Sequence, residues 1–322
     1  MKHFLIVPAV IVASILSGCM PKETAVNGKM PVAASIYPLA FLAEQVGGDF
    51  VSVTQITPGG IEPHDYDPSP RKIALVYDAK IFLMNGSGVD PWAGNLYTDL
   101  QSKKITVWNA SQHLDLLALP GIKSWTEKDM MQPDVEKRYP YGISDPHFWL
   151  DPLEFERAAR AITEEFKIAD APVLDSPRQN AYEQNFQRLS ASLRRLDSEY
   201  VSGLKNCALN KVIVSHDAFR YLAKHYNFET IAISGISPDE DPSPKHLADL
   251  ADLAKKNGIK YIFFETLVSP KLAETIASEI GAKTLVLNPI EGLTAEDIRN
   301  GKNYISLMEE NLQNLRAALQ CQ

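Results

Sequence analysis

Three histidines and one glutamate occupy comparable places in this sequence, and their side chains could together bind a metal. His64 lies in the stretch IEPHDYDPSP, His147 in SDPHFWLDP, His216 in KVIVSHDAF and Glu291 in LNPIEGL. Imidazoles and a carboxylate are the donors that a tetrahedral zinc site uses. Because the four residues are far apart in the chain, only the fold could assemble a site from them.

The pattern of apolar residues places these loops in an α/β fold. Strands are expected at Val32–Ile36, Val51–Ile56, Ile81–Asn85 and Ile105–Asn109, and again at Val212–Ser215, Thr230–Ser234, Tyr261–Glu265 and Thr284–Asn288. Helical stretches separate the strands, which favours parallel sheets. All four candidate ligands lie in loops, three of them clearly after strands, where open α/β sheets bind their ligands. With two ligands from each half, the predicted site lies in a cleft between two lobes.

A repeated motif supports two similar lobes. The sequence Asp-Pro-Ser-Pro occurs at residues 67–70 and 241–244, each time before a helical stretch and a further strand. Serine caps helices well and proline suits the first helical position, so two turns could also have acquired the motif independently. Between the halves, apolar residues at steps of three and four predict a helix over Gln179–Leu204, about 39 Å long, that joins the lobes as a stiff spine.

The chain therefore divides into five expected segments. These are a lipoprotein signal peptide over residues 1–19, a tether over 20–29, an N-terminal α/β lobe over 30–175, a linking long helix over 176–204 and a C-terminal α/β lobe over 205–322.

The N-terminal segment predicts export and a lipid anchor. Lys2 precedes an apolar run over Phe4–Leu16 that is too short to span a bilayer well. The following Leu-Ser-Gly-Cys resembles a bacterial lipobox, with Cys19 as the lipid attachment site. The alternative is an ordinary signal peptide that happens to contain a cysteine. We expect an extracytoplasmic protein, lipid-anchored to the cell membrane or periplasmic.

The expected extracytoplasmic location is oxidising, which favours disulfide formation between the two remaining cysteines. Cys207 and Cys321 are predicted to form a disulfide, and the alternative is two inert thiols.

The 322 residues carry a net charge of −8, which argues against a nucleic-acid partner because phosphate binding needs a basic face. We expect a monomer.

Several other residues near the candidate ligands are possible members of the site. Glu62 and Glu265 are rival carboxylate ligands to Glu291, and Trp149 either lines the cleft or packs in the core. Five aspartates are candidates to accept the second imidazole N–H and so orient the rings: Asp65, Asp67, Asp145, Asp151 and Asp217. Asp67 and Asp151 precede prolines and could instead shape turns.

Four motifs resemble those of one family. IEPHDYDPSP, SDPHFWLDP, LNPIEGLT and the stretch from Val214 to Leu222 are similar to the cluster A-I metal-binding lipoproteins of bacterial ABC transporters, particularly the zinc-uptake branch. The resemblance covers essentially the whole mature chain. It implies two α/β lobes joined by a rigid long helix, with metal in the cleft. It also implies the ligand set His64, His147, His216 and Glu291, and it ranks Glu291 above Glu62 and Glu265.

The chain departs from the family in two ways. Many zinc-uptake members carry a histidine-rich loop before the second ligand, whereas residues 114–146 contain no histidine. An auxiliary metal site of that type is not expected. Many members also have aspartate in place of Glu291. The manganese branch resembles the chain at the first two ligands but has carboxylates at the last two, so His216 favours zinc.

We therefore expect a receptor that binds Zn²⁺ as transported cargo and delivers it to an ABC import permease, with binding lost as the imidazoles become protonated. A small displacement of the lobes would break coordination and release the ion. The alternatives are a manganese receptor of the same family and a zinc-dependent hydrolase. A hydrolase usually leaves one coordination position open and has a base motif such as HExxH, so we do not expect an enzyme. An adhesin role could coexist with metal binding.

Overall fold

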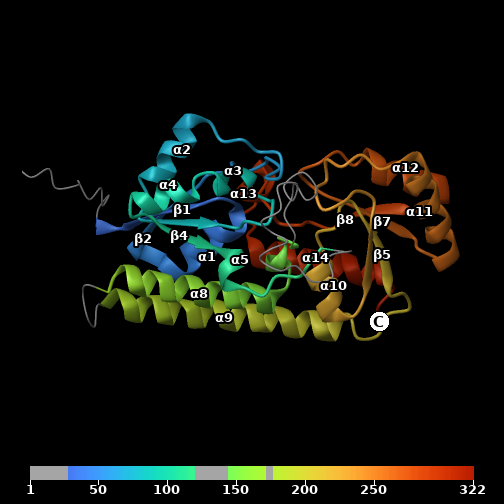
Figure 1. Cartoon of the computed structure of the whole chain (residues 1–322). Helices are drawn as coiled ribbons and strands as arrows, with labels where there is room; N and C mark the ends of the chain where they lie inside the picture. The colour runs from blue at the N-terminus through green and yellow to red at the C-terminus, as the bar shows by residue number, and fades with distance from the viewer. Residues whose placement is uncertain (1–27, 120–143, 172–176) are drawn as a thin grey trace, which may run out of the picture.

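Two parallel sheets with flanking helices form two lobes that lie side by side (Figure 1). The structure, a computed structural model, describes residues 28–119, 144–171 and 177–322. The predicted signal peptide, Cys19 and most of the predicted tether lie outside these residues. All eight predicted strands are present, each within two residues of its expected start.

The N-terminal lobe is built on a sheet with strand order β2-β1-β3-β4. Its strands are β1 (Met30–Ala34), β2 (Val51–Gln55), β3 (Ile81–Met84) and β4 (Thr106–Asn109). Its helices are α1 (Tyr37–Gly47), α2 (Pro70–Tyr77), α3 (Pro91–Gly94), α4 (Tyr97–Ser102) and α5 (Ala110–His113). The β1–β3 pair is buried on both faces, as expected for a parallel sheet covered by helices.

The C-terminal lobe repeats this topology with strand order β6-β5-β7-β8. Its strands are β5 (Lys211–Val214), β6 (Glu229–Ala232), β7 (Tyr261–Phe264) and β8 (Lys283–Val286). Its helices are α10 (Arg220–Tyr226), α11 (Pro244–Asn257), α12 (Lys271–Ile280), α13 (Ala295–Arg299) and α14 (Tyr304–Leu319). The two Asp-Pro-Ser-Pro motifs lead into α2 and α11, which connect corresponding strands. The predicted similarity of the lobes is confirmed.

Two long antiparallel helices run beneath the N-terminal lobe (Figure 1). They are α8 (Pro152–Ala169), which the Asp151 side chain caps, and α9 (Pro177–Gly203), the predicted spine. At 27 residues, α9 is about 40 Å long, and it packs against both α8 and α14. Its predicted apolar stripe is buried, with Leu204 just beyond the end of the helix, and the members within the helix are Tyr182, Phe186, Leu189, Leu193, Leu196 and Tyr200.

One apolar core extends through both lobes. It includes Leu39 of α1, Phe155 of α8, Val214 of β5 and Tyr304 of α14. The rings of Tyr304 and Phe155 lie 4.3 Å apart, so a C-terminal helix packs directly on the helices beneath the first sheet. Two smaller cores lie under the outer faces of the two sheets. The lobes therefore share a packed interface, and α9 is not the only element that holds them together.

The chain end is attached to the C-terminal lobe by the predicted disulfide between Cys207 and Cys321. This bond joins the segment after α9 to Cys321, two residues beyond the end of α14, and the backbone pairs there as an isolated bridge. None of the helices within the described residues has the length and apolarity needed to cross a membrane.

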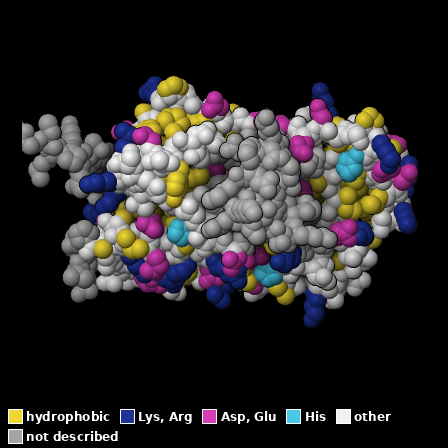
Figure 2. All heavy atoms as spheres, in the orientation of Figure 1, with side chains coloured by type: hydrophobic (Ala, Val, Ile, Leu, Met, Phe, Trp, Pro, Cys, Tyr) yellow, Lys and Arg dark blue, Asp and Glu magenta, His cyan; other side chains and the backbone are white. Residues whose placement is uncertain are grey.

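Acidic and basic side chains alternate along the face formed by α8 and α9 (Figure 2). Glu183 of α9 accepts hydrogen bonds from Arg160, Lys167 and Gln187. The Arg160 hydrogen bonds, followed by those from Lys167 and Gln187, hold the pKa of Glu183 well below its usual range. Because the folded-state pKa is depressed, the stabilisation is complete above the unfolded pKa and is lost as pH falls below it.

We expect Glu183→Gln to lower the free energy of unfolding at pH 7 by about 1 kcal/mol or less, since the group is partly exposed and screened by solvent. The difference in the free energy of unfolding between the variant and the unchanged protein should shrink below about pH 4.5, where the glutamate of the unfolded chain takes up a proton. Urea denaturation at pH 7 and pH 3.5 measures both effects. Glu199→Gln, which removes a glutamate whose one ion pair within the described residues is with Arg195, should cost less. A loss of stability that is the same at both pH values contradicts the assignment.

Candidate metal centre

The structure brings His64, His147, His216 and Glu291 together in one buried cluster. His64 lies in the loop between β2 and α2, and His147 directly precedes the short helix η3 (Phe148–Leu150). His216 follows β5, and Glu291 lies in the loop between β8 and α13. The four residues are at most 3% exposed. The loops at the carboxyl ends of the two sheets therefore meet between the lobes, as the strand pattern predicted.

The distances between the donor atoms match the edges of a small tetrahedron. His147 Nε2 lies 3.4 Å from His64 Nε2 and 3.3 Å from His216 Nε2. Glu291 Oε1 lies 3.6, 3.3 and 3.5 Å from the Nε2 atoms of His64, His147 and His216. Zinc bonds of about 2.0–2.1 Å give tetrahedral edges of about 3.3–3.4 Å. One ion placed between these atoms can thus reach all four donors with little rearrangement.

Two of the imidazoles are held by carboxylates in the same way. Asp145 Oδ1 accepts from both the backbone N–H of His147, at 3.0 Å, and its ring Nδ1, at 2.9 Å. Glu265 Oε1 accepts from the backbone N–H of His216, at 3.1 Å, and from its Nδ1, at 2.6 Å. A donated Nδ1–H leaves Nε2 unprotonated and directed at the cluster, which is the tautomer that a metal requires.

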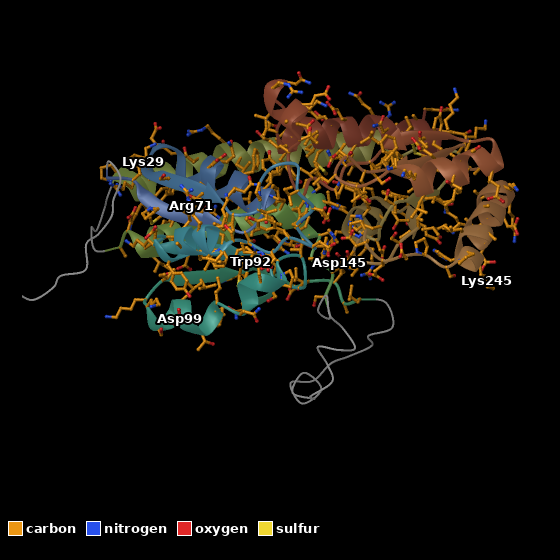
Figure 3. All side chains as sticks on the ribbon, turned by 90° about the horizontal axis from the view of Figure 1, so that it is seen from above. Lys29, Arg71, Trp92, Asp99, Asp145 and Lys245 are labelled. Carbon is orange, nitrogen blue, oxygen red and sulfur yellow. A yellow bond between two sulfur atoms is a disulfide. The ribbon has the colours of Figure 1, made fainter. Side chains whose placement is uncertain are left out.

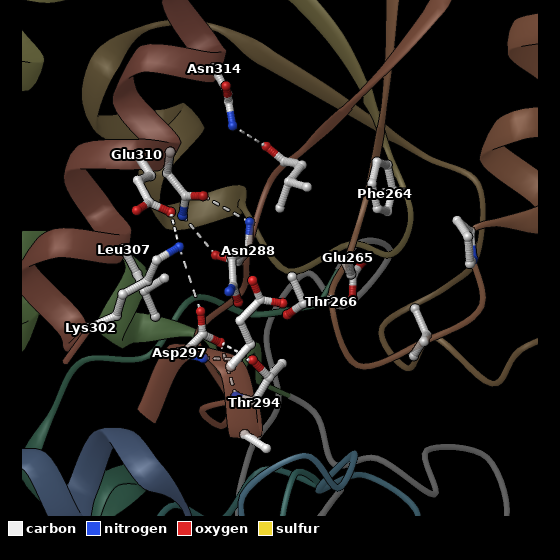
Figure 4. Close-up of a pocket in the computed structure, with 16 residues that line it drawn as sticks. Phe264, Glu265, Thr266, Asn288, Thr294, Asp297, Lys302, Leu307, Glu310 and Asn314 are labelled. Atoms are coloured by element: carbon white, nitrogen blue, oxygen red, sulfur yellow. Dashed lines mark hydrogen bonds and ion pairs between the residues drawn. The ribbon is translucent and has the colours of Figure 1, made fainter. Parts of the chain in front are cut away.

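Side chains of α14 fix the loop that carries Glu291. Asn311 donates to the carbonyl oxygen of Asn288 and accepts from its backbone N–H, while the Asn288 side chain accepts from the backbone N–H of Ile290. Asn314 donates to Val286 O at the free edge of β8 (Figure 4). These bonds replace the strand that β8 lacks on that side. They also hold Ile290 at a φ of 57°, which turns the chain so that Glu291 points inward.

The charges in the cluster depend strongly on one another. Burial, together with the charges of His147 and His216, outweighs the contacts with Glu291 and lowers the pKa of His64. Burial also opposes protonation of His147 and His216, but hydrogen bonds to Asp145, Glu265 and Glu291 outweigh it and raise the pKa of both.

The pKa values of Glu62 and Glu291 shift in opposite directions. For Glu291, burial is outweighed by the hydrogen bonds from the three imidazoles, which lower its pKa well below the usual range. Burial, followed by repulsion from Glu291, raises the pKa of Glu62 to about 10. The imidazoles therefore favour the ionised form of Glu291, whereas burial and repulsion favour the neutral form of Glu62. A divalent cation would favour the ionised form of Glu291 in the same way.

The remaining predicted residues have various roles. Asp145 orients an imidazole as expected, but for His216 this part is taken by Glu265, which the sequence placed among the rival ligands. Glu62 Oε1 accepts from the backbone N–H of His64. Trp149 is fully buried, and its ring stands 5.2 Å from that of His147.

The other four aspartates do not orient either His147 or His216. Asp151 caps α8 and pairs with His225, and Asp217 lies 3.8 Å from Arg220. Asp65 and Asp67 are exposed. Sequence reasoning did not identify Asn288, Asn311 or Arg220, whose contacts link segments far apart in the chain and leave no local pattern.

The fold and the cluster define a two-lobed α/β protein with a histidine-rich metal site between its lobes. Residues 32–318 match the ZnuA family, described as the zinc-uptake complex component A, periplasmic. The chain belongs to this family.

Several named proteins are similar to this chain in sequence and in structure. The chain is 36% identical over 317 residues to the zinc-binding lipoprotein AdcA of Streptococcus pneumoniae, covering 98% of this chain and 61% of AdcA. It is 34% identical over 291 residues to the high-affinity zinc uptake system protein ZnuA of Bacillus subtilis, covering 90% and 88% of the two chains. The Zn(II)-bound ZnuA-like domain of S. pneumoniae AdcA superimposes with a TM-score of 0.74 at 34% identity, covering 91% and 99%. The chain thus spans about three-fifths of full-length AdcA.

We expect Glu265→Gln to weaken metal binding about 10- to 100-fold, because the amide no longer offers a charged acceptor to His216 Nδ1. Competition between the protein and a chromophoric chelator for Zn²⁺ measures the change. Glu296→Gln is a matched control, since Glu296 lines the same groove of the C-terminal lobe as Glu265. Equal affinities of the two variants would show that Glu265 does not support His216.

Proposed function

We propose that this protein is an extracytoplasmic receptor that binds Zn²⁺ as cargo through His64, His147, His216 and Glu291 and delivers it to an ABC import permease. The five donor–donor distances of 3.3–3.6 Å carry the proposal. They fit a four-coordinate ion with three nitrogen donors and one oxygen donor. Family membership and the names of the zinc-binding relatives support the same cargo.

Zinc suits this donor set better than manganese. Imidazole nitrogen is a common zinc donor, and zinc accepts tetrahedral coordination, whereas manganese prefers octahedral sites rich in oxygen. The manganese alternative would require Glu62 or further oxygen donors to join the ion. Glu62 Oε1 instead accepts a hydrogen bond from the backbone N–H of His64.

The same geometry supports a receptor and argues against an enzyme. A catalytic zinc usually keeps one position for water or substrate. Here four buried protein donors supply a complete tetrahedron, so we infer that the ion is carried and not used in chemistry.

The proposed organisation follows from this role. The proposal includes removal of residues 1–19 as a signal peptide, lipid attachment at Cys19 and a tether over 20–29. It further includes lobes over 30–175 and 205–322, linked by a helix over 176–204. The protein would work as a monomer, attached to a membrane by its lipid and paired with its permease during delivery.

Competitive titration of the soluble protein with Zn²⁺ and Mn²⁺ tests the cargo. We expect one tightly bound Zn²⁺ per chain and much weaker binding of Mn²⁺. His216→Ala should reduce zinc affinity by more than the 10- to 100-fold that loss of an outer hydrogen-bond partner costs. His113→Ala removes an exposed histidine on α5 and should leave affinity unchanged. Unaltered zinc binding by His216→Ala, or a preference for Mn²⁺, contradicts the proposal.

A further inference from the structure

The segment that carries His147 precedes the spine in sequence, yet side chains of the C-terminal lobe hold it. Trp149 Nε1 donates to Pro289 O at 2.7 Å, in the loop that also carries Glu291. Tyr304 of α14 donates to Trp149 O at 2.6 Å. Both contacts are buried, so the backbone next to His147 is tied to the C-terminal lobe from that side.

Helix α10 holds the start of this segment. Arg220 Nη1 lies 3.4 Å from Asp145 Oδ2, and its Nη2 donates to Ala118 O at 3.0 Å. The hydroxyl of Tyr221 donates to Asp145 O at 3.0 Å and accepts from the backbone N–H of Leu117 at 2.7 Å. Asp145 lies in the centre of the molecule between the two lobes (Figure 3).

The same helix also holds the end of the segment. His225 Nδ1 lies 2.9 Å from Asp151 Oδ2, at the start of α8. From the N-terminal sheet, Asn85 Nδ2 donates to Pro146 O at 3.2 Å. Helix α10 therefore contacts both Asp145 and Asp151, the residues that bracket His147. It begins four residues after His216, so one short rigid element controls the positions of two imidazoles.

We propose that α10 positions His147 for metal binding, with Arg220 as the positioning residue that acts through Asp145. His147, His216 and Glu291 then form one unit with the C-terminal lobe, and His64 is the ligand that the N-terminal sheet contributes. This inference rests on the proposed metal-binding function of the four residues. It replaces the expected division of the ligands into two pairs.

The contacts of Asp145 give the physical reason. Its Oδ1 holds the backbone and ring N–H groups of His147, and its Oδ2 faces the Arg220 guanidinium. Asp145 is fully buried, so an ionised carboxylate there needs a charged partner. Without Arg220, the carboxylate is less well balanced and less firmly placed, and the imidazole that it orients loses its fixed direction.

If three ligands move together, the movement that exchanges the metal differs from a separation of the two lobes as independent halves. Separating the lobes as independent halves would have to break the hydrogen bonds of Trp149, Tyr221 and Tyr304 and open the shared apolar core. Changing the position of His64 relative to the other three ligands breaks none of these contacts. The proposal thus identifies His64 as the ligand whose displacement opens the site.

A double-mutant cycle tests whether Arg220 acts through His147. Zinc affinity is measured by chelator competition for Arg220→Ala in three backgrounds: the unchanged protein, His64→Ala and His147→Ala. We expect Arg220→Ala to weaken binding about 10- to 100-fold in the first two backgrounds and less than about threefold in the third. Arg220→Lys should recover part of the loss. Arg194→Ala, which removes an arginine paired with Glu156 between α8 and α9, should change affinity in none of them.

The outcomes separate this proposal from the function on which it rests. If Arg220→Ala has no effect on the unchanged protein, or the same effect in all three backgrounds, the positioning role is wrong while zinc binding stands. If the unchanged protein does not bind zinc, the proposed function and this proposal both fail. Tyr221→Phe provides a second variant if Arg220→Ala does not fold, because it removes the hydroxyl at Asp145 O and keeps the ring. It should show the same dependence on His147 with a smaller loss.

Discussion

An ionised carboxylate buried among three imidazoles is the constraint on which this structure depends. Removing such a charge from water costs several kcal/mol unless nearby groups balance it. Glu291 is 1% exposed and stays ionised because the imidazoles of His64, His147 and His216 face it. The same arrangement that balances this charge by protonated imidazole can balance it by a divalent cation. Stability of the interior and affinity for metal therefore have one electrostatic origin.

The site needs a rigid frame because a tetrahedron of donors tolerates little displacement. Asp145 and Glu265 hold two imidazoles by the same pair of hydrogen bonds, although one precedes its histidine by two residues and the other follows by 49. The Asn288–Asn311 pair directs the loop of Glu291. These outer groups decide which nitrogen or oxygen atom faces the ion. The geometry of the cluster therefore depends on them as well as on the four ligands.

The packing between the lobes limits how the ion can enter or leave. A single apolar core includes α1, α8 and α14, and the hydrogen bonds of η3 cross from one lobe to the other. A receptor of the kind proposed must release its cargo, yet such an interface resists separation. The proposed division into three ligands held by the C-terminal lobe and one from the N-terminal sheet would reconcile firm binding with release, because only one ligand would have to move.

The sequence by itself determined the eight strands, the repeat of the lobes, the long helix and the four candidate ligands. Alternating strand and helix patterns, and helices that begin with a Ser-Pro pair, are local signals. The loops after strands in such folds meet at one edge of the sheet. The motifs around the histidines also resembled one family. Only the tertiary structure decided that Glu265 supports His216, that α10 holds the segment of His147 and that one core joins the lobes. Those contacts pair residues far apart in the chain, and their partners depend on how the two sheets face each other, which no local pattern encodes.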